Sequence, residues 1–390
     1  MKIAGIIAEY NPFHNGHAHH IRSTREKTLC DYVVVCMSGS FTQRGEAACM
    51  DKWTRARIAL ECGADAVFDL PALFALRTAD AFARGGVEVL GRLGCDCLSF
   101  GSEFTDPDLL EKLAELRENE PPELSASIRQ KLDAGMSHAR ARGEAIAEML
   151  KLDPALLNSQ NMILASEYIR AIRSLGHSAM HPVAISRIGG YHDPSLGQFA
   201  SASAIREALA RGEAASAAAC VPPACRDALG QVSMHSMDDL LLHCLRSMPE
   251  SAIADLPDVN EGLEKRVLRC AREAASREEL LGLLKCKRYT HARLSRLCAH
   301  ALLGMTQALL DRHLLPDYAR LLGMRADAQP LLSELKKRSS LPIISDGSRL
   351  AGNEIFELEC RAADLRALLC NRPEERRAGQ EFTQKFVRVG

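Results

Sequence analysis

The stretch that decides the fold is Gly5-Ile6-Ile7-Ala8-Glu9-Tyr10-Asn11-Pro12-Phe13-His14-Asn15-Gly16-His17-Ala18-His19-His20. The apolar run from Ile3 to Ala8 has the length and the β-branched content of a buried strand. Asn11-Pro12 then predicts a turn, and a helix is expected to begin after it. The sequence therefore predicts a strand, a polar loop and a helix in direct succession.

His14 and His17 lie at the start of this predicted helix. Both side chains can reach one anion bound to the free amides of the helix N-terminus, and Gly16 has no Cβ to keep a phosphate away. Histidines near a helix start are often only surface residues. However, a His-x-Gly-His directly after the first buried strand of an α/β pattern is the signature of nucleotidyltransferases, in which the histidines stabilise charge on the α-phosphate.

Length, charge and cysteine usage limit the class of protein. A chain of 390 residues has room for two domains, and its formal net charge of -1 gives no global field that would attract nucleic acid. We find no apolar run long enough to span a bilayer and no signal peptide, so we expect a soluble cytoplasmic protein with no membrane association. The 14 cysteines are scattered and never form Cys-x-x-Cys, which predicts reduced thiols and no metal site.

Strands and helices alternate along the first half of the chain. Further strands are expected near residues 32–37, 64–71, 97–103 and 181–187. This pattern predicts an α/β fold: a Rossmann-like parallel-sheet nucleotidyltransferase domain over residues 1–215, with a helical insertion at about 106–152, followed by an all-helical C-terminal domain over 216–390. After residue 222 we expect no strand beyond a short extended piece near 341–346, and a loosely ordered charged tail from 371.

A second candidate phosphate site is Ser201-Ala202-Ser203-Ala204-Ile205-Arg206. Ser201 and Ser203 stand at a predicted helix N-terminus, where amides and hydroxyls can donate to a phosphate, and Arg206 one turn later adds a charged fork. Taken alone, the pattern could equally be an N-cap with a surface arginine. Together with the histidine pair it matches the second nucleotidyltransferase motif.

Three residues after the second predicted strand leave alternatives open. Trp53, the only tryptophan, is expected to be a core anchor. Arg44 and Lys52 are either part of a solvated face or cations that meet a triphosphate or an RNA backbone.

Several of these motifs together resemble one family, the tRNA(Met) cytidine acetate ligases, over nearly the whole chain. The motifs that carry the resemblance are Glu9-Tyr10-Asn11-Pro12-Phe13-His14-Asn15-Gly16-His17, Met37-Ser38-Gly39-Ser40-Phe41-Thr42-Gln43-Arg44-Gly45-Glu46, Phe100-Gly101-Ser102-Glu103, Asn161-Met162-Ile163-Leu164, Arg187-Ile188-Gly189-Gly190-Tyr191-His192-Asp193 and Ala200-Ser201-Ala202-Ser203-Ala204-Ile205-Arg206. The string Tyr-Asn-Pro-Phe-His-x-Gly-His is far more specific than His-x-Gly-His alone.

The resemblance implies an enzyme that uses ATP and acetate to acetylate the wobble cytidine of elongator tRNA(Met) through an acetyl-adenylate. Magnesium is the expected metal cofactor, although no metal-ligating side chain is assigned. The catalytic residues it implies are His14, His17 and Arg206. The implied ATP-binding residues are Ile7, Ala8, Glu9, Tyr10, Asn11, Pro12, Phe13, His14, Asn15, Gly16, His17, Ala18, His19, His20, Gly101, Asn161, Arg187, Ser201 and Ser203. Without the resemblance, Asn161 could equally cap its helix.

The clearest feature of the later chain is a basic run from Lys285 to Arg296 without an acidic residue. On a helix, leucines and small residues share one face, and Tyr289, Arg293, Arg296 and His300 share the other. We expect this second face to bind RNA, with phosphates held by the cations and a base stacked on Tyr289, although a solvated helix face is the ordinary explanation. The residues assigned to RNA are Lys285, Lys287, Arg288, Tyr289, Arg293 and Arg296.

Three functions compete at this stage. An acetate-activating tRNA ligase uses both the nucleotide site and the later helical region. A small-molecule nucleotidyltransferase would leave the helical region unexplained. A non-catalytic RNA-binding protein with a nucleotide pocket would not need two histidine donors. No stable protein partner is evident.

Overall fold

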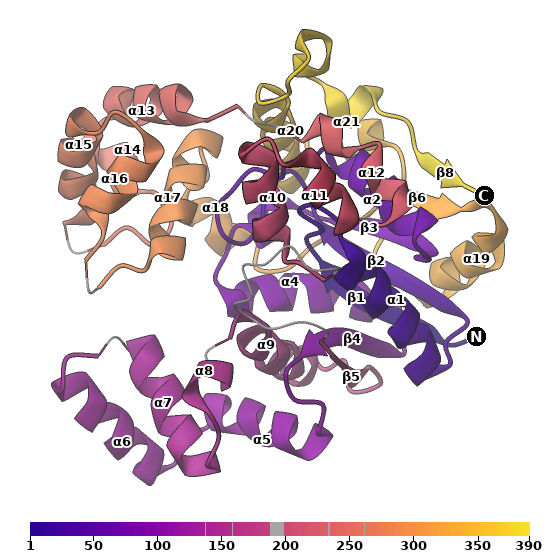
Figure 1. Ribbon diagram of the computed structural model, residues 1–390, viewed down its shortest axis with the longest axis horizontal. Helices are drawn as coiled ribbons and strands as arrows, with labels where there is room; N and C mark the ends of the chain where they lie inside the picture. The colour runs from indigo at the N-terminus through magenta and orange to yellow at the C-terminus, as the bar shows by residue number, and fades with distance from the viewer. Residues whose placement is uncertain (137, 158, 188–198, 233–234, 261, 287) are drawn as a thin grey trace.

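A twisted sheet with helices on both faces forms the centre of the computed structural model, which describes residues 1–136, 138–157, 159–187, 199–232, 235–260, 262–286 and 288–390 (Figure 1). Its strands are β1 (Ile3–Ala8), β2 (Tyr32–Ser38), β3 (Ala66–Leu70), β4 (Cys97–Ser102), β5 (His181–Ser186), β6 (Ala319–Arg325), β7 (Ile343–Ile344) and β8 (Val387–Val389). The order is β5-β4-β1-β2-β3-β6-β7, with β8 paired to β6. The strands from β5 to β3 are parallel, which confirms the predicted α/β class.

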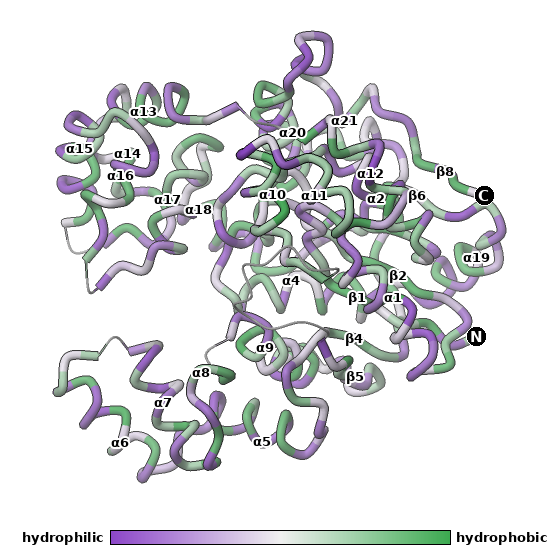
Figure 2. Tube along the Cα trace, viewed as in Figure 1, coloured by the Kyte–Doolittle hydropathy of each residue, from purple (hydrophilic) through white to green (hydrophobic). Residues whose placement is uncertain are grey.

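Alternation along the strands explains why both faces of the sheet are covered. In β2, Val33 and Val35 pack on one face with residues of helices α1, α2 and α10, whereas Val34 and Cys36 pack on the other with residues of α4 and α9. The helices of this part are α1 (Asn15–Thr28), α2 (Lys52–Glu61), α3 (Ala72–Ala75), α4 (Ala79–Arg92), α9 (Gln160–Ser174), α10 (Ala202–Ala210), α11 (Ala214–Ala219) and α12 (Pro223–Arg226). Figure 2 shows the apolar character of the sheet strands as green tube.

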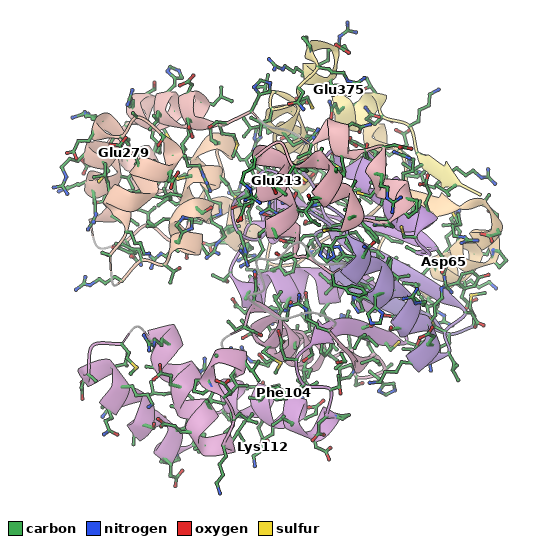
Figure 3. All side chains as sticks on the ribbon, viewed as in Figure 1. Asp65, Phe104, Lys112, Glu213, Glu279 and Glu375 are labelled. Carbon is green, nitrogen blue, oxygen red and sulfur yellow. The ribbon has the colours of Figure 1, made fainter. Side chains whose placement is uncertain are left out.

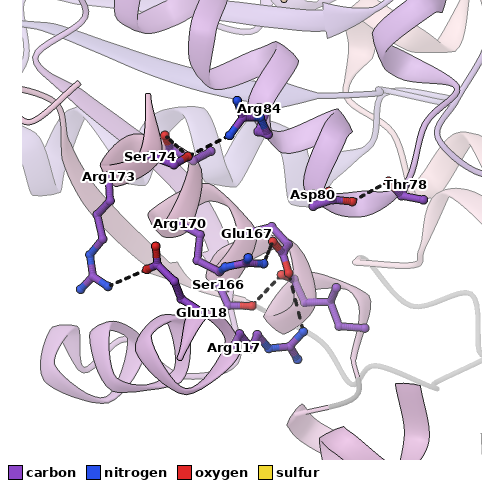
Figure 4. Close-up of polar contacts among 12 residues, drawn as sticks. Thr78, Asp80, Arg84, Arg117, Glu118, Ser166, Glu167, Arg170, Arg173 and Ser174 are labelled. Atoms are coloured by element: carbon purple, nitrogen blue, oxygen red, sulfur yellow. Dashed lines mark hydrogen bonds and ion pairs between the residues drawn. The ribbon is translucent and has the colours of Figure 1, made fainter. Parts of the chain in front are cut away.

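The region at about 106–152 is helical, as the sequence predicts. It forms α5 (Pro107–Glu118), α6 (Pro122–Asp133) and α7 (His138–Leu150), followed by α8 (Pro154–Leu157). Ion pairs join α5 to α9: Arg117 lies 3.9 Å from Glu167, and Arg173 lies 4.0 Å from Glu118 (Figure 4). These contacts fasten the outer helices to the helix that packs on the sheet.

A separate hydrophobic cluster holds the helices that follow residue 237. They are α13 (Asp238–Ser247), α14 (Glu250–Ala254), α15 (Leu263–Glu273), α16 (Arg277–Leu284) and α17 (His291–Leu303). We call α13 to α17 the helical module; it is the lobe at the upper left of Figure 1. The chain continues through α18 (Gln307–Arg312), α19 (Gln329–Arg338), α20 (Glu354–Ala367) and α21 (Gln380–Thr383). Among the described residues, no helix is both long enough and apolar enough to cross a membrane.

The expectation of no strand beyond the short piece near 341–346 is wrong at both β6 and β8. β6 is antiparallel to β3, and β8 pairs with β6 in the tail that was expected to be loosely ordered. The sequence of β6, Ala-Arg-Leu-Leu-Gly-Met-Arg, contains no β-branched or aromatic residue, so its leucines read as helix. Tertiary pairing with β3 overrides this local preference.

Candidate active site

The strand order predicts a binding crevice at the carboxyl end of β1. The chain goes from β1 to β2 on one side and later returns to place β4 on the other side of β1. At such a reversal the connecting loops diverge and leave room for a ligand. The loop from Glu9 to Phe13 and the first turn of α1 stand at this crevice, as predicted.

His14 and His17 form a reciprocal cap at the start of α1. The Nδ1 atom of His14 accepts from the amide of Gly16 at 3.1 Å, and the Nδ1 atom of His17 accepts from the amide of His14 at 3.2 Å. A neutral imidazole that accepts at Nδ1 carries its proton on Nε2. The backbone therefore fixes both rings in the tautomer that leaves an Nε2–H free to donate.

The two rings are stacked and half-buried together. Their centroids are 3.6 Å apart, and the His17 ring also meets Tyr10 at 4.8 Å and Phe13 at 5.4 Å. Burial, followed by the positive charge of Arg187, lowers the pKa of His14 to about 3. Burial also lowers the pKa of His17 well below its usual value, and the neighbouring His14, His20 and Arg187 act in the same direction. Both imidazoles are therefore neutral hydrogen-bond donors near pH 7.

Three further predicted residues, Gly101, Asn161 and Arg187, gather around Glu103 near the ends of β4 and β5. The carboxylate of Glu103, just after β4, accepts from Asn161 Nδ2 at 3.2 Å and lies 3.7 Å from Arg187 Nη1. A Cβ on Gly101 would lie 3.5 Å from the Arg187 side chain. Gly101, Asn161 and Arg187 therefore lie together around Glu103, and the positive charge of Arg187 helps to lower the pKa of both histidines.

Asn161 does not cap α9. That role belongs to Ser159, whose side chain accepts from the amide of Met162. Asn158 and the motif from Ile188 to Asp193 lie outside the described residues. The amide of Asn161 is thus directed toward Glu103 and the crevice instead of its own helix.

Arg206 contacts the histidine loop rather than the histidines. Its Nη1 donates to the carbonyl of Asn11 at 2.6 Å, and its Nη2 to Glu46 at 3.2 Å. Ser201 caps α10 by accepting from Ala204, and Ser203 is half-buried on the same turn. The structure therefore brings His14 and His17 together and joins Arg206 to the same loop through Asn11.

The remaining residues of the predicted ATP stretch divide by their packing. Tyr10 and Phe13 are buried in the core, while Asn15 donates to the carbonyl of Ala219 at 3.2 Å. His20 meets Ser99 at 3.0 Å, so its ring faces β4, and His19 meets Ser23 at 3.3 Å along its own helix. Neither of these last two rings joins the stacked pair.

Arg55 is a site-shaping residue that sequence reasoning missed. Its side chain is fully buried and donates to the carbonyls of Glu9 at 2.7 Å, Ser38 at 3.0 Å and Met50 at 3.2 Å, and also to that of Gly39. These carbonyls belong to the end of β2 and to the loops after β1 and β2. An arginine among the apolar residues of α2 was the available signal, because a buried guanidinium must satisfy several acceptors at once.

Lys52 is not a phosphate-binding residue in this arrangement, so that alternative is wrong. Its ammonium is fully buried and pairs with Asp69, Glu359 and Glu381. These carboxylates are the one group with metal-ligand spacing among the described residues, and the lysine supplies the cation they surround. Trp53 is 6% exposed in the core, as predicted.

The predicted RNA-binding face of α17 is mostly buried, and this expectation needs correction. Tyr289 is 7% exposed, belongs to the core of the helical module, and is covered by the Arg293 guanidinium at 4.8 Å. Arg296 is 6% exposed, and His300 meets the carbonyl of Leu76 at 2.8 Å. His300 on this face therefore contacts the sheet domain, and the face is covered by protein instead of being open to phosphates.

The other described residues assigned to RNA are exposed or half-buried. Lys285 and Arg288 are exposed, and Lys287 lies outside the described residues. Arg293 donates to the carbonyl of Asp258 and to Asn260 Oδ1, the latter at 3.1 Å. A base therefore has no access to Tyr289 in this structure.

The chain is similar to known proteins in both sequence and structure. A sequence model of the family described as HIGH Nucleotidyl Transferase matches residues 1–381. The tRNA(Met) cytidine acetate ligase of a Thermoanaerobacter species is 36% identical over 406 residues, covering 100% of both chains, and that of Clostridium perfringens is 37% identical, covering 95% of this chain and 96% of the relative. The crystal structure of Thermotoga maritima TmcAL bound with alpha-thio ATP is similar with a TM-score of 0.89 and 31% identity, covering 100% of both chains.

Proposed function

Because this chain belongs to the tRNA(Met) cytidine acetate ligases, a family of HIGH nucleotidyl transferases, we propose that it activates acetate with ATP and acetylates the wobble cytidine of elongator tRNA(Met). One observation carries the proposal. Two neutral, stacked imidazoles, whose Nδ1 atoms accept from the backbone so that each Nε2–H can donate, lie at the carboxyl end of β1, where the strand order reverses. The product is N4-acetylcytidine.

The reaction has two balanced steps. An acetate oxygen attacks the α-phosphorus of ATP, the bond between the α-phosphorus and its bridging oxygen to the β-phosphate breaks, and pyrophosphate leaves with that electron pair. The exocyclic amine of cytidine then attacks the acetyl carbonyl, AMP leaves, and the nitrogen loses a proton. Adenylation is required because acetate alone has no good leaving group.

The histidine pair has the properties that the first step needs. Negative charge grows on the α-phosphate oxygens as the acetate oxygen approaches, and fixed Nε2–H donors stabilise that charge without reorganisation. Neutral rings in the fixed tautomer keep this capacity throughout the neutral pH range, because no proton has to be gained or lost first. His14 and His17 thus act as electrophilic donors and not as general bases.

The two arginines would serve the phosphates and the loop. Arg187 lies close enough to the histidine pair to affect both of their pKa values, so it is placed to neutralise phosphate charge. Arg206 donates from Nη1 to the carbonyl of Asn11 and so holds the histidine loop in place, while its Nη2 donates to Glu46. A triphosphate would compete with Glu46 for that nitrogen.

Magnesium fits the residues at the crevice. Mg²⁺ is usually bound by one or two carboxylates together with substrate phosphates. The Oε2 atom of Glu103 is buried and has no hydrogen-bond partner among the described residues, so it is a free carboxylate ligand beside Arg187. When bound there, the ion would supply positive charge to the phosphates.

The predicted division of the chain at residues 215 and 216 is refined by the packing. We propose that residues 1–215 supply the nucleotide site and that α13 to α17 supply the contact with tRNA, because this module has its own core. Residues 319–389 contribute β6 to β8 to the sheet and therefore belong structurally with the nucleotide-binding part.

The test is a turnover assay with ATP, labelled acetate and tRNA(Met) transcript, in which AMP, pyrophosphate and label are followed. We expect acetate-dependent release of pyrophosphate and entry of label into the tRNA. His17→Asn should reduce both, whereas His313→Asn is the matched control, since His313 follows α18 and pairs with Glu354, and neither residue is assigned to the site. Nucleotide transfer to a small molecule, or equal loss in both variants, would overturn the proposal.

A further inference from the structure

An exposed basic stripe on α15 has no assigned purpose. Lys265, Arg269 and Arg272 occupy positions i, i+4 and i+7 and are all exposed. This spacing puts three cations on one face of the helix over about 10 Å, given a rise of 1.5 Å per residue. The opposite face carries Leu263, Val267 and Cys270 into the core of the helical module.

The stripe differs from the other arginines around it in its partners. Arg266 donates to the carbonyl of Leu283 at 2.9 Å, and Arg246 donates to the carbonyl of Ala271 at 2.8 Å. Arg266 is therefore used to join α15 to α16, and Arg246 to join α13 to α15. Lys265, Arg269 and Arg272 make no ion pair or hydrogen bond with any residue that the structure describes, so their charges face solvent.

The composition of the surface indicates what it binds. α15 has no aromatic residue, so it offers no platform for a base. Its exposed face carries the three flexible cations, with Glu273 as an exposed acidic residue at the C-terminal end. Such a surface matches the phosphates of a nucleic acid backbone and not a base edge. Glu278 and Glu279 in the first turn of α16 add further acidic charge beyond Glu273; Figure 3 labels Glu279 on the same lobe.

The helical module is also held firmly against the nucleotide-binding part. Ser295 of α17 donates to the carbonyl of Arg44, and Arg277 donates to the carbonyl of Gly45 at 3.4 Å. The amide of Gln43 in the same loop donates to Glu9 at 2.7 Å, directly after β1. A ligand held by α15 is therefore held at a fixed position relative to the histidine loop.

We propose that Lys265, Arg269 and Arg272 bind the phosphate backbone of the substrate tRNA away from the base that reacts. This inference rests on the proposed function and replaces the RNA surface expected on α17, whose face is occupied by protein contacts. The stripe provides affinity and orientation without reading sequence, since only phosphates meet it. Selection of the tRNA must come from other contacts.

The experiment compares two triple variants with equal loss of charge. In the first, Lys265, Arg269 and Arg272 are each replaced by Gln. In the control, Lys336, Lys385 and Arg388 are replaced by Gln; these exposed cations lie on α19 and the C-terminal segment, on the opposite side of the molecule (Figure 1). The Kd for tRNA(Met) transcript is measured between 0.05 and about 0.3 M salt, a range in which phosphate contacts dominate the salt dependence.

The stripe variant should lose about one unit of salt slope per side chain, or about three in all, and bind tRNA at least about tenfold more weakly at 0.1 M salt. The control should keep the slope and affinity of the unchanged protein. Acetate-dependent pyrophosphate release without tRNA should be the same in all three proteins, which shows that they are folded and tests the proposed function separately.

Two results overturn the inference. Equal tRNA affinity and slope in the stripe variant and the unchanged protein would show that the stripe is only a solvated face. Equal weakening in both variants would show that net charge alone matters. The two proposals can also fail separately. If the unchanged protein releases no pyrophosphate with acetate, but tRNA binding is weakened in the stripe variant and not in the control, the proposed function is wrong and the RNA surface stands.

Discussion

Replacing His14 separates two tasks that one side chain performs. The Nδ1 atom of His14 caps α1 by accepting from Gly16, and the Nε2–H is free to donate to a phosphate. Asparagine is among the best N-cap residues, so His14→Asn keeps an acceptor for the cap while removing the Nε2–H. His14→Ala removes both.

The magnitudes differ enough to be told apart. Loss of an N-cap acceptor costs about 1 kcal/mol of stability, with a range of about 0.5–2. Loss of one preorganised donor to a developing oxyanion costs about 10²–10³ in kcat. We therefore expect His14→Asn to unfold in urea within about 0.5 kcal/mol of the unchanged protein, and His14→Ala to be less stable by about 1 kcal/mol. Both should lose about 10²–10³ in acetate-dependent pyrophosphate release.

The assay pairs urea unfolding with pyrophosphate release at saturating ATP and acetate. Saturation matters because a donor that acts only as charge develops lowers kcat, whereas a purely ground-state contact raises KM. If His14→Asn keeps normal kcat while His14→Ala loses both stability and activity, the imidazole serves the helix alone and our account of the site is refuted.

Three other changes test the supports of the site. Lys52→Met should lower the free energy of unfolding at pH 7 by about 3–5 kcal/mol in urea titrations, because it leaves three buried carboxylates unpaired, and a loss under about 1 kcal/mol would contradict the pairing. Burial lowers the pKa of His300 to about 4, so the unfolded chain binds an extra proton between about pH 6.5 and 4, and stability falls as pH falls. His300→Asn should flatten that decline by up to about 1.4 kcal/mol per pH unit in urea titrations at several pH values. Equal slopes in the two proteins would argue against this account of His300. Gly45→Ala should lower the melting temperature more than Gly304→Ala. Both glycines have positive φ, but only a Cβ on Gly45 would meet the backbone of α17, at 2.5 Å. Equal shifts would mean that the loop and α17 are not tightly packed.

Local sequence was sufficient for the histidine loop and the strands around it. β1 and β2 are short β-branched runs, and His14 begins a helix directly after the first of them, so pattern and position agreed. Arg187 and Asn161 were assigned to the site by the family resemblance, and Arg187 follows β5 at the edge of the sheet where ligands of parallel sheets meet. These predictions needed no knowledge of distant contacts.

Distant contacts are what the sequence could not supply. Arg296 lies on a helix face that looks solvated, yet the loop after β2, some 250 residues earlier, presents its backbone to that face. Lys52 is neutralised by acids at positions 69, 359 and 381, and only folding brings them together. A cation in a helix pattern has the same appearance whether its partner is water, a phosphate or a buried carboxylate.

The loop from Phe41 to Ala47 connects the histidine loop to the helical module. On one side its Gln43 amide bonds Glu9, whose backbone carbonyl is held by Arg55 beside the histidine loop; on the other, the carbonyls of Arg44 and Gly45 receive Ser295 and Arg277 of the helical module. Because each contact uses backbone atoms of one short segment, the module cannot shift by much without disturbing the support of the histidines. A tRNA that binds the module thus meets a nucleotide site whose position is already set, and we attribute the buried basic face of α17 to this requirement for fixed geometry.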